Sequence, residues 1–172
     1  LTNWDAPTYM PCLAVSDSVT HLVYDEFIDN WEIYYKRSTD GGVNWEQETR
    51  LTNNPGYSTS PSIALFGSNV YVVWQDKTID STGDILFKAS SDGGATFGGL
   101  KKLNSNTNTI KDDTDRISAS SNNISTIWSD ASDIANYVSA TYSAIDVQFS
   151  ASQYSLNSTA TITVTDSVHA GS

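Results

Sequence analysis

One ten-residue pattern occurs twice in this chain, and its spacing restricts the fold more than any other feature. Lys36–Trp45 reads KRSTDGGVNW, and Lys88–Phe97 reads KASSDGGATF, 52 positions later. Each copy follows an alternating apolar and aromatic run, which is typical of a β-strand. Asp-Gly-Gly after such a run indicates a tight turn between antiparallel strands, because glycine adopts the positive φ angles that tight hairpins need. The chain therefore repeats a hairpin at a fixed interval.

The repeat continues on both sides of the two hairpins. Glu32–Lys36 aligns with Asp84–Lys88 at the same offset, and the residues upstream align at an offset of 50. The second copy carries four short predicted strands, near Pro61–Leu65, Asn69–Gln75, Asp84–Ser90 and Leu100–Leu103. Four antiparallel strands in a repeat of about fifty residues are typical of a β-propeller blade. A β-sandwich with accidental internal similarity is the alternative.

A third copy is weaker. Asp115–Asp130 aligns with Ser60–Asp76 at an offset of 54. After an insertion of eight residues, Asp146–Ser152 aligns with Asp84–Ser90, the third strand of the unit, but no Asp-Gly-Gly follows. We therefore predict an all-β fold, a partial β-propeller of about three four-stranded antiparallel blades. The expected blades span residues about 4–52, about 53–104 and, in degenerate form, about 105–152.

The last twenty residues, 153–172, lie outside these units. Ser158–Asp166 alternates like a strand, so we expect a C-terminal strand segment. It resembles the start of an immunoglobulin-like module, and it could equally add to the sheet edge of a neighbouring subunit.

The two hairpins resemble the Asp-box, or BNR repeat, of sialidase-like β-propellers, whose pattern is Ser-x-Asp-x-Gly-x-Thr-Trp. The resemblance covers roughly residues 1–152 and implies a propeller fold in which the box is structural and lies far from the ligand-binding face. The matching residues, with Phe97 replacing Trp, are Ser38, Asp40, Gly42, Trp45, Ser90, Asp92, Gly94 and Phe97.

Charge and composition restrict the partners. Nine basic and twenty acidic residues give a net charge of −11, which argues against nucleic-acid binding. No apolar run is long enough to span a membrane. Richness in Ser, Thr and Asn, with glycosylation sequons at Asn123 and Asn157, favours an extracellular or cell-surface location.

A sialidase of the resembling family uses an arginine triad, an aspartate acid/base and a tyrosine–glutamate nucleophilic pair. This chain has three arginines, of which Arg116, at the start of the third unit, is the best placed. The family's Arg-Ile-Pro is absent, because Ser118 follows Ile117. A retaining glycosidase also needs two carboxylates about 5 Å apart, which the sequence does not pair. We therefore expect no catalytic residues in this chain.

Two further kinds of site are candidates. Trp74 and Trp128 occupy one repeated blade position and, with Arg116, are candidate glycan-binding residues, although core packing explains the tryptophans better. Acidic clusters offer oxygen ligands suited to Ca²⁺, although solvated acidic turns explain them better. No other cofactor is expected. The candidate metal ligands are Asp80, Asp84, Asp112, Asp113 and Asp115.

The sequence thus favours a non-catalytic, extracellular Asp-box propeller module that acts in cell-surface structure, adhesion or glycan binding. One alternative is a fragment of a sialidase-like glycoside hydrolase. The other is a self-assembling envelope or filament subunit that shares strands between chains. The expected partners are further blades of a parent chain or identical subunits, and glycans.

Overall fold

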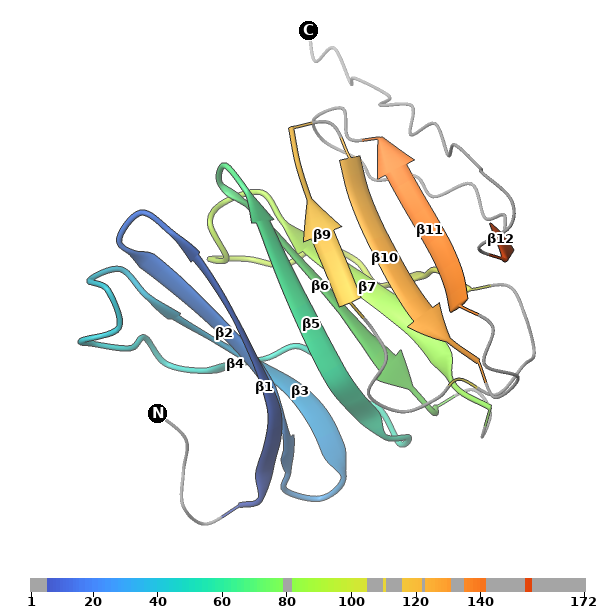
Figure 1. Cartoon of the computed structure of the whole chain (residues 1–172). Helices are drawn as coiled ribbons and strands as arrows, with labels where there is room; N and C mark the ends of the chain where they lie inside the picture. Colours follow the sequence, from blue (N-terminus) through green and yellow to red (C-terminus); the bar gives the residue numbers. More distant parts are fainter. Residues whose placement is uncertain are drawn as a thin grey trace, which may run out of the picture.

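The computed structural model describes residues 6–78, 82–104, 110, 116–121, 123–130, 135–141 and 154–155. These residues form twelve β-strands and no helix, arranged as three four-stranded antiparallel sheets (Figure 1). The predicted all-β, partial-propeller fold is confirmed. We call the sheets blade 1, blade 2 and blade 3.

Each blade is built from four strands that are consecutive in the sequence. Blade 1 contains β1 (Thr8–Ser16), β2 (Val19–Phe27), β3 (Trp31–Ser38) and β4 (Thr49–Arg50). Blade 2 contains β5 (Ser58–Phe66), β6 (Asn69–Asp76), β7 (Asp84–Ser90) and β8 (Lys101–Lys102). Blade 3 contains β9 (Arg116–Ala119), β10 (Asn123–Ser129), β11 (Ala135–Thr141) and β12 (Tyr154–Ser155).

The third strand of blade 3 differs from the prediction. The expected strand, Asp146–Ser152, lies outside the described residues, and the strand that pairs with β10 is β11, Ala135–Thr141. The supposed insertion therefore contains the strand, because a short connection after Asp130 brings β11 directly against β10. The fourth strand, β12, begins after residue 152, so blade 3 extends past its expected boundary. The predicted strand within Ser158–Asp166 lies outside the described residues.

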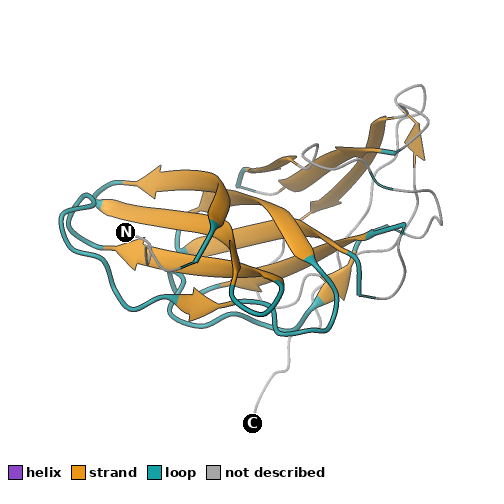
Figure 2. Cartoon of the chain, turned by 90° about the horizontal axis from the view of Figure 1, so that it is seen from below, coloured by secondary structure: helices purple, strands orange, loops and turns teal. Residues whose placement is uncertain are grey.

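The blades stand in a row, with blade 2 between the other two (Figures 1 and 2). Their first strands, β1, β5 and β9, run in the same direction, so all three begin at one end of the molecule. Apolar side chains fill the spaces between neighbouring blades, which is where the hydrophobic stabilisation lies. Between blades 1 and 2 the core includes Val23, Ile33, Tyr35, Val72, Trp74 and Leu86. Between blades 2 and 3 it includes Tyr71, Val73, Phe87, Ile124, Trp128 and Val138.

Polar contacts repeat together with the strands. The amide of Ile33 donates to Thr52 Oγ1 at 2.8 Å, and the amide of Ile85, 52 positions later, donates to Asn104 Oδ1 at 2.8 Å. In both blades a polar side chain just beyond the fourth strand satisfies a buried amide of the third strand. The sequence repeat therefore conserves hydrogen bonds between strands as well as the pattern of apolar residues.

Candidate functional site

The first Asp-Gly-Gly hairpin is held by its own side chains. Ser38 Oγ donates to Asp40 Oδ1 and accepts from the amide of Gly42 at 2.9 Å. Asp40 also accepts from the amide and the side chain of Asn44, at 2.8 and 2.7 Å. Trp45 Nε1 donates to the Gly42 carbonyl at 3.0 Å. Every one of these bonds closes the turn on itself.

The second hairpin has the same bonds with different side chains. Ser90 Oγ donates to Asp92 Oδ1 and accepts from the Gly94 amide at 2.8 Å. Thr96 takes the place of the asparagine and donates its amide and hydroxyl to Asp92, at 2.9 and 2.6 Å. Hydrogen bonds from Asn44 hold the pKa of Asp40 down at about 2, and those from Thr96 likewise lower the pKa of Asp92. Both carboxylates are therefore ionised at neutral pH and satisfied within their turns.

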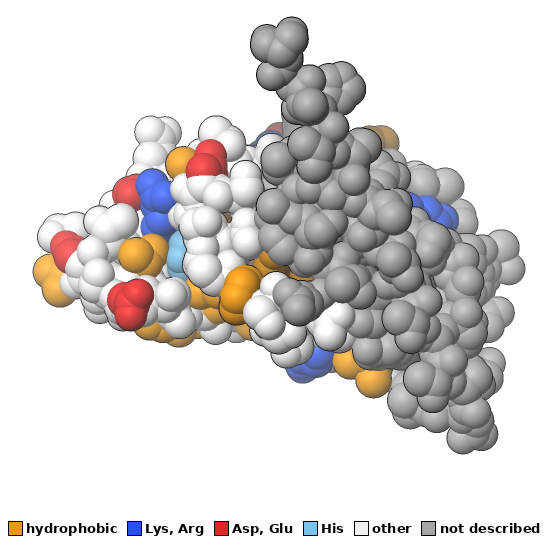
Figure 3. All heavy atoms as spheres, turned by 90° about the horizontal axis from the view of Figure 1, so that it is seen from above, with side chains coloured by type: hydrophobic (Ala, Val, Ile, Leu, Met, Phe, Trp, Pro, Cys, Tyr) orange, Lys and Arg blue, Asp and Glu red, His pale blue; other side chains and the backbone are white. Residues whose placement is uncertain are grey.

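The hairpins lie at the end of the molecule where β1 and β5 finish, because β3 and β7 run in the same direction as β1 and β5 (Figure 1). Viewed from this end, the coloured part of the surface mixes acidic, basic, apolar and uncharged groups (Figure 3).

The opposite end, where the first strands begin, contains a hollow of about 370 Å³ between blades 1 and 2. Its walls come from the starts of β1, β3 and β5 and from the ends of β2 and β6. The lining residues are Tyr9, Met10, Asp25, Trp31, Tyr57, Thr59, Ser60 and Lys77.

Three aromatic side chains give this hollow its chemical character. Tyr9 is 56% exposed and Tyr57 is 51% exposed, so each offers much of its ring to solvent. Trp31 makes edge-to-face contacts with Tyr9 and Phe27, both with ring centroids 5.3 Å apart, and these contacts fix its orientation. The hollow therefore presents aromatic surface that is already ordered.

Asp25 supplies the carboxylate of the hollow. It is 2% exposed, and its Oδ2 accepts a hydrogen bond from the amide of Ser60 at 3.0 Å. Since Asp25 lies in β2 and Ser60 in β5, the bond ties blade 1 to blade 2 at the base of the hollow.

A second hollow, of about 210 Å³, adjoins the first and shares Met10 and Ser60 with it. Both residues precede a proline, lie at a β-bulge and have positive φ, 47° and 58°. Positive φ in residues other than glycine carries strain, and such strain often marks functional sites. The lining residues are Met10, Pro11, Cys12, Ser60, Pro61, Ser62 and Arg116.

The structure separates the three predicted ligand-binding residues. Arg116 lines the second hollow, at the start of β9. Trp74 and Trp128 are fully buried in the cores between the blades, so neither is accessible to a glycan. Their stacking role is therefore corrected to core packing, the other explanation that the sequence offered.

The predicted calcium ligands are not brought together in the described part of the chain. Asp84 is buried and forms an ion pair with Lys102. Asp80, Asp112, Asp113 and Asp115 lie outside the described residues. Among those that are described, no three His, Cys, Asp or Glu side chains form a group that could hold a metal ion.

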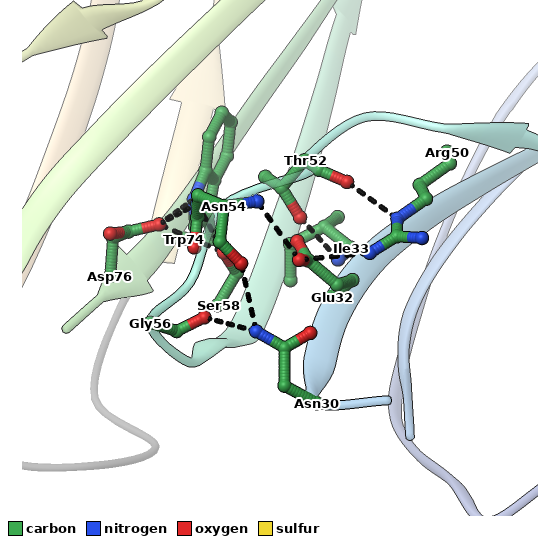
Figure 4. A network of polar contacts seen from close by, with 10 residues as sticks. All are labelled: Asn30, Glu32, Ile33, Arg50, Thr52, Asn54, Gly56, Ser58, Trp74 and Asp76. Atoms are coloured by element: carbon green, nitrogen blue, oxygen red, sulfur yellow. Dashed lines mark hydrogen bonds and ion pairs between the residues drawn. The ribbon is translucent and has the colours of Figure 1, made fainter. Parts of the chain in front are cut away.

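A polar network joins blade 1 to blade 2 through the segment that connects them (Figure 4). Asp76 accepts from Asn54 Nδ2 at 2.9 Å and from Ser58 Oγ at 2.8 Å. Glu32 accepts from the Asn54 amide and from Arg50, both at 3.0 Å. These buried carboxylates hold the connection between the blades in place, so Asp76, one of several acidic residues that end strands, has a structural role.

Sequence reasoning missed Tyr9, Trp31 and Tyr57. A usable signal was present, because Tyr9 lies at the start of a proline-containing first strand and Tyr57 immediately precedes the corresponding strand of blade 2. These three residues meet at one hollow because of how two blades pack, and no local sequence pattern predicts that packing.

Comparison with solved structures shows the fold. The chain is similar to a sialidase of Trypanosoma rangeli, with a TM-score of 0.56 and 13% identity over 87% of this chain and 31% of that one. It is also similar to the catalytic domain of a GH62 α-L-arabinofuranosidase of Coprinopsis cinerea (TM-score 0.52, 14% identity, 78% and 46% covered). A variant of the NanB sialidase of Streptococcus pneumoniae matches with a TM-score of 0.51 and 15% identity, over 84% of this chain and 23% of that one.

The chain thus covers less than half of each of these structures. No family model matches the sequence, and no curated protein matches it either. Within the described ranges, no helix has the length and hydropathy needed to cross a membrane. At these identities the likeness establishes the fold alone: three sheets of a sialidase-like propeller.

Proposed function

We propose that this chain is a non-catalytic glycan-binding part of an extracellular propeller, and that the hollow between blades 1 and 2 is its binding site. The observation that carries the proposal is the grouping of Tyr9, Trp31 and Tyr57 in one hollow. Aromatic faces stack against the C–H groups of a sugar ring, and Tyr9 and Tyr57 are both exposed.

The hollows favour binding over hydrolysis. Hydrolysis of a glycoside normally uses two carboxyl groups on opposite sides of the scissile bond. Among the described residues that line the two hollows, Asp25 alone carries a carboxyl group. The neighbouring structures that are sialidases and arabinofuranosidases are enzymes acting on sugars, which supports a sugar ligand.

The extracellular location is part of the same proposal. Richness in Ser, Thr and Asn, and the two sequons, support it. A surface with net negative charge also stays soluble without attracting nucleic acid.

The test is binding of the purified chain to an immobilised panel of sialylated, arabinofuranosylated and neutral glycans, followed by calorimetry with the best soluble glycan. We expect Tyr9→Ala and Tyr57→Ala each to weaken binding about tenfold, equivalent to about 1.4 kcal/mol. Phe66→Ala is the matched control, because Phe66 is an exposed aromatic residue at the other end of β5. Absence of binding at millimolar glycan, or equal loss in the control, contradicts the proposal.

A second candidate, a fragment of a sialidase-like hydrolase, is favoured by Arg116, which lines the adjoining hollow. A tyrosine–glutamate pair exists as well, since Tyr24 Oη donates to Glu48 at 2.7 Å, but neither residue lines either of the two hollows. Burial raises the pKa of Tyr24, so its phenol remains protonated and is a poor nucleophile. Turnover of a fluorogenic sialoside that Arg116→Ala abolishes would establish the hydrolase and overturn the non-catalytic assignment.

A further inference from the structure

Two strained residues lie where the two hollows meet. Met10 in β1 and Ser60 in β5 line both hollows and occupy the same repeat position, 50 residues apart. Each has positive φ, and each is followed by a proline, which restricts the preceding residue to extended backbone. Each also lies within a bulge that interrupts the strand pairing. The part of the wall that the hollows share is therefore backbone in an unfavourable conformation.

Another position with positive φ provides a comparison within the chain. In the turn between the first two strands, Asp17 of blade 1 has a φ of 52°, and its counterpart in blade 2 is Gly67, with a φ of 57°. Glycine adopts this conformation without steric cost, so one of the two copies is unstrained there. At the bulges, Met10 and Ser60 both keep a side chain where glycine would relieve the strain.

Asp25 holds the two bulges in place. Its buried carboxylate accepts the hydrogen bond of the Ser60 amide at 3.0 Å. In the sheet, Asp25 lies directly opposite Tyr9, the residue that precedes Met10. Strained backbone persists only where the surrounding structure fixes it, and here one buried residue contacts both strands at their bulges.

The two hollows follow one another along the first strands of blades 1 and 2. The larger hollow, of about 370 Å³, is lined by residues that precede the bulges, among them Tyr9 and Thr59. The smaller hollow, of about 210 Å³, is lined by residues that follow them, among them Cys12 and Ser62. The bulges therefore separate two neighbouring hollows on one path.

The two hollows differ in chemistry. The larger hollow presents the exposed rings of Tyr9 and Tyr57. None of the described residues that line the smaller hollow is aromatic, and its exposed members are Met10, Pro11 and Arg116. Met10 and Pro11 offer apolar contact, and the Arg116 guanidinium offers hydrogen-bond donors. A sugar ring presents both C–H groups and oxygen acceptors, so each hollow suits one ring in a different way.

We propose that the two hollows are consecutive subsites of one groove, and that its ligand is a linear glycan of at least two sugar residues. This inference rests on the proposed function, because it takes the larger hollow to be a sugar site. One ring stacks on the exposed tyrosines, the next accepts hydrogen bonds from Arg116, and the bond between them lies over Met10. Small-molecule sites measure about 300–1,000 Å³, so the larger hollow alone is near the lower limit and a longer ligand extends beyond it.

The strained bulges set the spacing of the two subsites. A bulge bends its strand and re-aims the side chains on either side of it. With the backbone fixed at Met10 and Ser60, Tyr9 and Arg116 keep a constant separation, which matches one particular distance between neighbouring rings. A glycine at either position would allow the two lining segments to move relative to each other, and the advantage of a two-ring ligand would fall.

The experiment is calorimetry on the full 172-residue chain with named probes: xylose, xylobiose and xylotriose, the corresponding arabinose series, and sialic acid with sialyllactose. In the series that binds best, we expect the two-ring ligand to bind at least about tenfold more tightly than the single sugar. Arg116→Met should remove about tenfold of affinity for the longer ligand and leave the single sugar unchanged. Tyr57→Ala should weaken both by the same factor.

Glycine substitutions test the role of the strain. Met10→Gly and Ser60→Gly should each reduce the preference for the longer ligand at least about threefold. Their melting temperatures should stay the same or rise, because glycine removes the strain. Asp17→Gly is the matched control, since it relieves the same kind of strain in the turn between β1 and β2, away from the residues that line the hollows, and should leave the preference unchanged.

The outcomes separate this inference from the proposed function. Equal affinity for one-ring and longer ligands, weakened alike by Tyr57→Ala, would overturn the two-subsite groove and leave the proposed glycan site in place. Glycine variants that keep the full preference would overturn the role of the bulges. Absence of binding to every probe would overturn both the groove and the proposed function.

Discussion

The two Asp-Gly-Gly hairpins have the same internal bonds but different neighbours. In each, a serine and an aspartate close the turn, and two glycines have positive φ, between 70° and 90°. The second hairpin packs against Tyr35 and Arg37 of blade 1, whereas a Cβ on Gly41 of the first hairpin would meet no atom within 4 Å. One motif thus stabilises its own turn in both places, and in blade 2 it also fastens one blade to another.

The largest expected effect comes from making the same glycine-to-alanine substitution in each hairpin, which separates the two roles. Gly94→Ala should lower the free energy of unfolding by about 3 kcal/mol or more, because its Cβ combines an unfavourable positive φ with a collision against Tyr35. Gly42→Ala has the same backbone cost, but the nearest atom to its Cβ is 3.8 Å away in its own Trp45, so we expect about 1 kcal/mol. Chemical denaturation measures both. Equal losses would show that the second hairpin is not held by blade 1.

Removing the docking arginine should have a smaller effect. Arg37→Met keeps the aliphatic stem and loses the hydrogen bond to the Gly93 carbonyl, which we expect to cost about 1–2 kcal/mol. Glu46→Gln is the control, since it removes only the partly exposed ion pair with Arg37 and should cost less than about 1 kcal/mol. A greater loss in Glu46→Gln would assign the effect to the ion pair instead of the docking contact.

The smallest expected effect concerns pH and should be common to both hairpins. Because the pKa of Asp40 is about 2 when folded and 3.8 in its ordinary state, ionised Asp40 stabilises the fold above about pH 4. This contribution is lost as the pH falls from about 4 toward 2, and that of Asp92, whose pKa is also lowered, falls in the same direction. Melting temperatures of Asp40→Asn and Asp92→Asn should therefore lie below that of the unmodified chain at pH 7 and approach it in acid. A constant difference across this range would exclude the carboxylates as the cause.

Local turns and strands could be predicted from the sequence, whereas the meeting of residues that are far apart in the sequence could not. Asp-Gly-Gly dictates a turn wherever it occurs, so the hairpins and the strands around them were predicted correctly in blades 1 and 2. Blade 3 lacks that turn, and there a resemblance to the Asp84–Ser90 motif displaced the third strand from its place in Ala135–Thr141. The aromatic hollow could not be predicted, because Tyr57 and Trp31 line one hollow only through the packing of two blades.

The buried tryptophans show that a repeated sequence position does not by itself indicate a binding site. Trp74 and Trp128 recur at one blade position, and recurrence alone does not distinguish a binding platform from a core. In a propeller every blade must fill the same gap to its neighbour, so a large side chain repeated in each blade is expected inside. The exposed aromatic residues Tyr9, at the start of β1, and Tyr57, just before β5, lie outside the cores between the blades, where packing imposes no such demand.

The bonds of Asp76 set an order of events during synthesis on the ribosome. Blade 1 can complete its sheet from contacts made entirely within its own strands, but Asn54 and Ser58 find their shared acceptor only when the end of β6 has emerged. At about 5–20 residues per second, the 26 residues between the end of β4 at Arg50 and the end of β6 at Asp76 take about one to five seconds to appear. During that interval the face of blade 1 formed by Val23 and Ile33 has no blade against it. A nascent chain is therefore most exposed to mispairing, and most open to chaperone binding, between the translation of its first and second blades.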